Sequence, residues 1–120
     1  MRQMLLSSSS SSLTKKILKK FFSKIKDLKV LVIICPENKT QEAKYQRKTK
    51  KILKKLGILN IQIVNIRKNV KAKNYENCDI FWSSGGNTFL ILDRIRKTGF
   101  DKYIKNHVSK GKLYLGFSAG

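Results

Sequence analysis

Hydrophobic and polar positions along the chain follow two patterns: short runs of continuous apolar residues, and longer stretches in which apolar residues recur every three or four positions. The clearest run is Val30–Ile34, where five apolar residues, most of them β-branched, follow one another. A strand that is apolar on both faces is typical of the interior of a parallel sheet. With the shorter runs included, the expected strands are residues 2–6, 30–34, 61–66, 79–82 and 112–115.

The recurring pattern predicts helices, because residues three and four apart share one face of a helix. The stretch 41–56 carries such an apolar stripe, and Gly57 follows it as a helix C-cap. In another stretch the side chains of Phe89, Leu92 and Ile95 are expected to point inward. The expected helices cover approximately residues 13–25, 41–56, 87–97 and 101–108.

Strands and helices alternate along the sequence, which predicts an α/β fold: a three-layer sandwich with a mostly parallel sheet and helices on both faces. One domain over residues 1–120 is expected, since this length suffices for a hydrophobic core. Ligands of such sheets bind outside the carboxyl ends of the strands. The serine tract 7–12, the loop 83–87 and residues 116–120 each follow an expected strand, so we expect all three on one rim of the sheet.

The chain is strongly basic: 27 lysines and arginines stand against 7 acidic residues, giving a net charge of +20. Clustered cations would indicate a polyanion such as nucleic acid, because binding releases counterions. Here the cations are spread over every expected helix, and there is neither an RNP-like aromatic motif nor zinc-finger spacing. Compositional drift toward lysine explains this distribution better than a nucleic-acid site. A basic α/β module that binds nucleic acid or another polyanion is the alternative.

The two cysteines, Cys35 and Cys78, border apolar strands and lack metal-ligand spacing, which predicts small buried side chains in a reducing, cytoplasmic compartment. No apolar run approaches the roughly 20 residues that span a bilayer, so no membrane partner is expected. Residues 1–26 contain no acid and many serines and lysines, a composition shared with transit peptides. A first strand, a serine loop and a helix over 13–25 that covers the sheet is the preferred interpretation; that helix lying on a membrane surface is the alternative.

Residues 116–120, Gly-Phe-Ser-Ala-Gly, match the G-x-S-x-G pattern of a nucleophile elbow. An elbow is a sharp turn after a strand that exposes one serine hydroxyl, here that of Ser118. The oxyanion formed on nucleophilic attack needs N–H donors, and the residue after the nucleophile, Ala119, normally supplies one. Gly85 or Gly86 suits the second donor, because a glycine backbone can approach the reacting carbonyl closely.

A serine nucleophile also needs a base, usually a histidine that a carboxylate orients. The one histidine, His107, falls on the helix before the last strand and is expected to be a surface or helix-end residue away from the rim. Asp93 and Asp101 are expected to be solvated helix residues, and Asp79 starts a strand at the opposite end of the sheet. The residues therefore offer a nucleophile without an activating pair.

Two segments, residues 81–89 (FWSSGGNTF) and 114–120 (YLGFSAG), together resemble the dipeptidase E and cyanophycinase family of serine peptidases, which shows a G-G-G-N-T-F loop followed by a G-W-S-A-G elbow. The resemblance implies a flavodoxin-like fold similar to class I glutamine amidotransferases. It implies Ser118 as nucleophile and an oxyanion hole from Gly85 or Gly86 with Ala119. It also implies hydrolysis of small peptides next to an aspartate. A cationic chain is suited to such acidic substrates. No cofactor is implied.

The chain departs from the family pattern in two ways. Ser84 stands in place of the first glycine of the loop. The family's acid and histidine lie beyond the elbow, so the resemblance covers the N-terminal half of a family member and implies a truncated, inactive chain. A missing half would leave apolar surface exposed, from which we expect association into a homo-oligomer.

Overall fold

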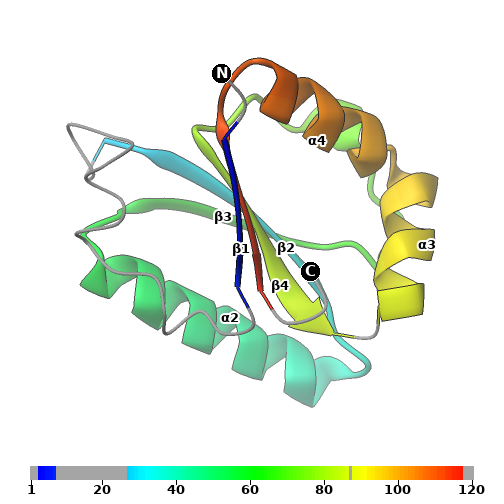
Figure 1. Cartoon of the computed structure of the whole chain (residues 1–120). Helices are drawn as coiled ribbons and strands as arrows, with labels where there is room; N and C mark the ends of the chain where they lie inside the picture. Colours follow the sequence, from blue (N-terminus) through cyan, green and yellow to red (C-terminus); the bar gives the residue numbers. More distant parts are fainter. Residues whose placement is uncertain (1–2, 8–26, 87, 118–120) are drawn as a thin grey trace.

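The computed structural model describes residues 3–7, 27–86 and 88–117 (Figure 1). The expected helix over 13–25 and residues 8–12 of the serine tract lie outside these ranges. The described elements, in chain order, are β1 (Gln3–Ser7), β2 (Lys29–Cys35), α2 (Lys39–Lys55), β3 (Asn60–Asn65), the short 3-10 helix η2 (Ala72–Asn74), β4 (Ile80–Gly86), α3 (Thr88–Thr98), α4 (Phe100–Ser109) and β5 (Leu113–Phe117).

The five described strands form one parallel sheet in the order β1-β5-β4-β2-β3. β2 lies inside this sheet, between β4 and β3, as its continuous apolar sequence predicted. Its side chains alternate between two separate hydrophobic cores, because successive residues of a strand point to opposite faces. Val30, Val32 and Ile34 enter one core, and Leu31, Ile33 and Cys35 enter the other.

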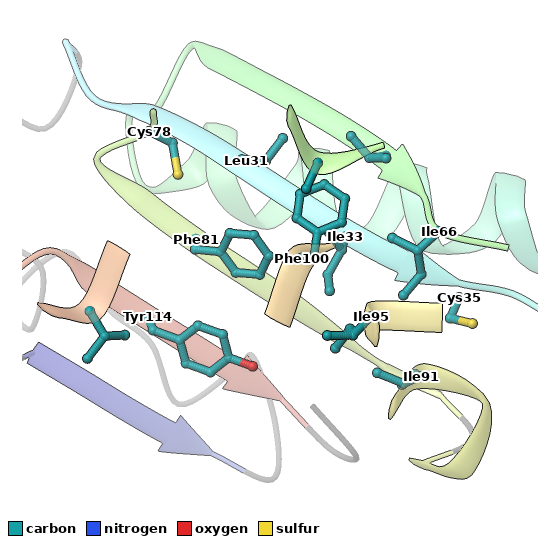
Figure 2. Close-up of a cluster of buried hydrophobic side chains, with 13 residues drawn as sticks. Leu31, Ile33, Cys35, Ile66, Cys78, Phe81, Ile91, Ile95, Phe100 and Tyr114 are labelled. Carbon is teal, nitrogen blue, oxygen red and sulfur yellow. The ribbon is translucent and has the colours of Figure 1, made fainter. Parts of the chain in front are cut away.

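Helices cover both faces of the sheet, so the predicted three-layer α/β arrangement is confirmed. α2 lies on one face, while α3 and α4 lie on the other (Figure 1). Leu53 and Trp82 belong to the core under α2. Phe81, Ile91 and Phe100 belong to the core under α3 and α4, which Figure 2 shows in close-up.

The inward face of α3 differs from the predicted one. Ile95 is buried as expected, but Phe89 is 86% exposed and Leu92 is 49% exposed. The residues that face the sheet are Ile91 and Ile95, which are four positions apart and therefore lie one above the other on the helix. Aromatic and aliphatic residues occur all around this short helix, so the hydrophobic pattern alone did not fix its orientation.

The direction of strand addition reverses between β2 and β4. After β2 the chain adds β3 on one side, and then crosses to add β4 on the other side. If β2 is taken as the first strand, β3, β4 and β5 follow in the flavodoxin-like order. In that order ligands bind where the direction of strand addition reverses. The rim that the sequence singled out is therefore the end of the sheet where the topology favours a site.

Candidate active site

Three strands that precede candidate loops end side by side. β1 pairs with β5 from Gln3 and Leu113 up to Ser7 and Phe117, and β4 pairs with β5 up to Ser83 and Gly116. Because all of these pairs are parallel, the carboxyl ends of β1, β4 and β5 meet at one rim (Figure 1). β5 ends one residue before the candidate nucleophile Ser118. Ser118 and the candidate donor Ala119 both lie outside the described residues.

Gly85 and Gly86 are the last two residues of β4, whereas the sequence predicted a loop from residue 83 onward. The strand continues because β2 still offers a backbone partner: Gly86 pairs with Cys35. Between this pair and the pair of Ser83 with Ile33 the register shifts, so that β4 contains one residue more than β2. Such bulges redirect the backbone and recur next to active sites. The two glycines thus reach the rim on a bulged strand end rather than on a free loop.

Ser83 lies directly below this bulge and is completely buried. Its Oγ forms no hydrogen bond within the part of the chain that the structure describes. Tyr114 also belongs to this part of the core, and its ring stacks on Phe81 at a centroid distance of 5.6 Å. Burial raises the pKa of Tyr114, and the Ser83 hydroxyl partly opposes that rise. The two hydroxyls are therefore neighbours in the core.

The Tyr114 hydroxyl is directed along β5 toward its carboxyl end (Figure 2). Tyr114 precedes Ser118 by four residues, so its side chain lies in the layer of the core directly beneath the rim. The apolar core next to the rim therefore contains two hydroxyl groups, those of Ser83 and Tyr114.

His107 is on the last turn of α4, so the helix-end alternative of the prediction holds, whereas the surface alternative does not, because only 4% of His107 is exposed. Its Nδ1 lies 3.9 Å from the Sγ of Cys78, and its ring lies 6.2 Å from that of Phe81. The backbone N–H of Lys112 donates to the His107 carbonyl, which places His107 at the start of β5. A strand of five residues spans about 17 Å, so His107 is at the wrong end of the sheet to act as a base at the rim.

The aspartates lie where the sequence predicted. Asp93 is exposed on α3 and forms a salt bridge of 3.2 Å with Lys97, and Asp101 is exposed in the first turn of α4. Asp79 precedes β4, where its carboxylate accepts a hydrogen bond of 2.8 Å from the Lys29 backbone. None of these three carboxylates lies at the rim.

Two arginines at the carboxyl ends of β2 and β3 were not singled out by the sequence. The Arg94 guanidinium donates from Nε to the Ile66 carbonyl at 2.7 Å and from Nη2 to the Lys68 carbonyl at 3.0 Å. Arg67 donates from Nη1 to the Pro36 carbonyl at 3.0 Å. In the hydrophobic pattern both are ordinary polar residues. Only the fold shows that Arg67 joins the segments after β2 and β3, and that Arg94 joins α3 to the segment after β3.

These arginines also make this part of the rim electropositive. The pKa of the buried Cys35 thiol is raised by burial, and the charges of Arg67 and Arg94 oppose the rise.

Both cysteines are buried and free, as predicted. Within the described ranges, no three His, Cys, Asp or Glu side chains gather as a metal ion would require. None of the described helices is long and apolar enough to cross a membrane.

The parallel sheet, the reversal of strand order and a serine motif directly after β5 define a doubly wound α/β protein with its candidate site at the carboxyl rim. The family model of peptidase family S51 matches residues 4–120. The chain therefore belongs to peptidase family S51. This confirms the resemblance that the two motifs indicated.

Curated relatives include an uncharacterized peptidase, Lin0382, of Listeria innocua, which is 36% identical over 78 residues. Peptidase E of Shigella flexneri is 38% identical over 76 residues. Each of these matches covers 63% of this chain, but only 37% and 32% of the respective relative.

Solved structures show the same fold. A protein assigned as a peptidase E from Listeria monocytogenes EGD-e superposes with a TM-score of 0.78 at 29% identity, over 100% of this chain and 60% of the other. A peptidase from an acI-B1 actinobacterium superposes with a TM-score of 0.77 at 16% identity, over 100% of this chain and 55% of the other. The chain thus spans little more than half of each solved relative.

Proposed function

We propose that this chain supplies the nucleophile half of a serine peptidase site. Ser118 is the nucleophile, and the backbone N–H groups of Ala119 and of Gly85 or Gly86 bind the oxyanion. The observation that carries the proposal is the parallel pairing of β4 with β5, which brings the Gly85–Gly86 strand end beside the strand that leads to Ser118.

The reaction follows from these roles. The Ser118 hydroxyl attacks the carbonyl carbon of a peptide bond while its proton passes to a base, and the carbonyl oxygen becomes an oxyanion. Backbone donors that are fixed before the reaction stabilise this charge without reorganisation. The amine then leaves with a proton, and water releases the acyl group from Ser118.

His107, the one histidine of the chain, lies at the opposite end of the sheet from the rim. We therefore expect residues 1–120 alone to be inactive. Catalysis by an oxyanion hole without the full triad is weak. A chain that continues beyond Gly120 with an acid and a histidine at the rim would restore activity.

Peptides that carry an aspartate next to the cleaved bond are the proposed substrates. Arg67 and Arg94 lie around the carboxyl ends of β2 and β3, and they give this side of the rim a positive field, whereas Lys68 is paired with Glu42. A carboxylate near the scissile bond would be attracted there. The proposed partner is therefore a small, acidic peptide.

The two buried free thiols agree with the reducing, cytoplasmic location that we propose for the chain.

A chimaera tests the nucleophile assignment. Residues 1–120 are joined to the part of the Listeria monocytogenes structure that this chain does not cover, and the product is treated with a fluorophosphonate probe and with aspartyl dipeptides. We expect covalent labelling and hydrolysis in the chimaera, and neither in residues 1–120 alone. Ser118→Ala should abolish both activities, whereas Ser109→Ala, on the outer side of α4, should abolish neither. Labelling that persists in Ser118→Ala would show that another residue is the nucleophile.

A further inference from the structure

A hollow lies away from the rim, at the corner where α3 passes into α4. This corner cleft has a volume of roughly 780 Å³, and its other wall is the segment 71–77, which contains η2 and leads into β4. α3 begins directly after β4 and ends at Thr98, so the cleft lies about one helix length, or 16 Å, from the rim. A hollow of this volume accommodates a small organic ligand.

Positive charge converges on the corner cleft. Only one acidic residue, Asp101, is part of its lining. Five cations line it: Lys71, Lys73, Arg96, Lys97 and Lys102. Of these, Lys97 forms a salt bridge with Asp93, and the other four have no salt-bridge partner in the described part of the chain. Cations that surround one hollow raise its positive potential more than cations that project separately into water.

The backbone adds hydrogen-bond donors to the same place. α4 begins after Gly99, whose φ of 85° lies in the left-handed region, and no side chain caps the first turn of this helix. Gly99, Asp101 and Lys102 all line the cleft. The first amides of a helix have no acceptor within it and carry partial positive charge. An anionic group in the cleft would therefore meet backbone donors as well as the lysine and arginine side chains.

Two aromatic residues are part of the lining of the cleft, and one of them is fixed by a hydrogen bond. Tyr75 and Tyr103 are half-buried and line it. The Tyr103 hydroxyl donates a hydrogen bond of 2.6 Å to the Glu76 carbonyl, which fixes the segment 71–77 against α4. Asn77 and Asn106 add amide groups to the lining. Ring surfaces and amides suit the organic part of a ligand better than they suit a bare inorganic ion.

We propose that the corner cleft binds a small organic phosphate of nucleotide size. Its phosphate groups lie among Lys71, Arg96, Lys102 and the first turn of α4, and its ring lies toward Tyr75. Arginine is suited to this position, because its planar guanidinium donates two parallel hydrogen bonds to a phosphate. This site is separate from the rim and does not depend on the proposed peptidase chemistry.

Isothermal titration of the whole chain with ATP tests the proposal. We expect Arg96→Gln and Lys102→Gln each to weaken binding by about tenfold, since each removes a charge-assisted hydrogen bond. Asp101→Asn should strengthen binding, because it removes the one carboxylate that repels phosphate. These three side chains are exposed, so the fold should be retained, and circular dichroism checks this.

Lys50→Gln and Lys51→Gln, on the outer face of α2, are the matched controls for net charge. They should change the affinity by less than about twofold, because salt screens distant exposed charges. Ser118→Ala should also bind ATP normally. The proposal is wrong if ATP does not bind, or if the control variants weaken binding as much as the cleft variants. It is equally wrong if a single-stranded oligonucleotide binds far more tightly than ATP and is insensitive to the cleft variants.

Discussion

Ser83 has a hydroxyl that the fold buries without a hydrogen-bond partner among the described residues. A buried polar group in this state costs free energy, whereas a methyl group does not. We expect Ser83→Ala to raise the free energy of unfolding by about 1 kcal/mol in urea titrations. Ser109→Ala, which removes an exposed hydroxyl from α4, is the control. A loss of stability in Ser83→Ala would show that the hydroxyl is bonded, with Tyr114 as a candidate partner.

The buried thiols and phenols make the chain sensitive to alkali. Burial raises the pKa of Cys35 and Cys78 above 9.0, and it raises the pKa of Tyr103 and Tyr114 above 10.0. The folded state then holds protons that the unfolded state has released, so the free energy of unfolding falls as the pH rises. The fall should begin near pH 9.0, where unfolded thiols ionise, and continue until the raised folded-state values are passed.

Urea titrations between pH 7 and 11 would measure this decline. Tyr103→Phe and Cys78→Ala each remove one of the groups responsible. In each variant the free energy of unfolding should therefore fall less steeply at the high end of this pH range. An identical alkaline slope in these variants would mean that other groups control it.

At the residue scale the sequence predicted the buried cysteines but not the buried histidine. Cys35 and Cys78 border apolar strands, so their burial follows from local context. His107 is buried because it packs against Cys78 and Phe81, which come much earlier in the chain. Its position four residues after Tyr103, on the inward side of α4, was the one local signal. A polar residue on the inward side of a helix is weak evidence for burial unless its tertiary neighbours are known.

At the element scale, Arg94 joins α3 to the backbone that follows β3. Its guanidinium donates to the carbonyls of Ile66 and Lys68. Arg94→Gln should lower the free energy of unfolding by about 1–2 kcal/mol, because hydrogen bonds from a charged donor are lost. It should also speed amide exchange at residues 66–68. Arg47→Gln, on the exposed face of α2, should do neither. Unchanged exchange in Arg94→Gln would mean that the hydrogen bonds do not hold this segment.

The element pattern was predicted well where local sequence determines it. Gly57, with a φ of 91°, ends α2 as expected, because glycine adopts this backbone conformation without strain. β4 was predicted too short, since Ser83 to Gly86 resemble a turn when taken alone. Their pairing with β2 and β5 makes them a strand, and pairing between distant segments is not encoded in the local pattern.

At the scale of the whole molecule, the outer face of α3 carries two neighbouring apolar side chains in contact with solvent. Phe89 is 86% exposed and Leu92, three residues later, is 49% exposed. We propose that this pair promotes the association that the sequence led us to expect. Phe89→Gln with Leu92→Gln should lower the average mass measured by light scattering. Leu59→Gln, at an isolated exposed leucine, should have no effect. If the double variant and the parent have the same mass, α3 is not the contact surface.

The overall architecture could be predicted because alternating strand and helix patterns restrict the choice of topology. The rim followed from the same rule, since it requires only the direction of the strands. The electropositive arginines and the corner cleft could not be predicted. They arise where segments far apart in sequence approach one another, such as Arg94 with Lys68, and residues 71–77 with α4.

The pairing of the first described strand with the last one constrains the order in which the molecule can fold during synthesis. Gln3–Ser7 is made long before its partner in the sheet, which is Leu113–Phe117. β2, β3 and β4 can pair with one another much earlier, because they are closer in sequence. Closing so long a loop is slow. β1 therefore stays without its sheet partner until residues 113–117 have been made, and a chaperone would be most useful during that interval.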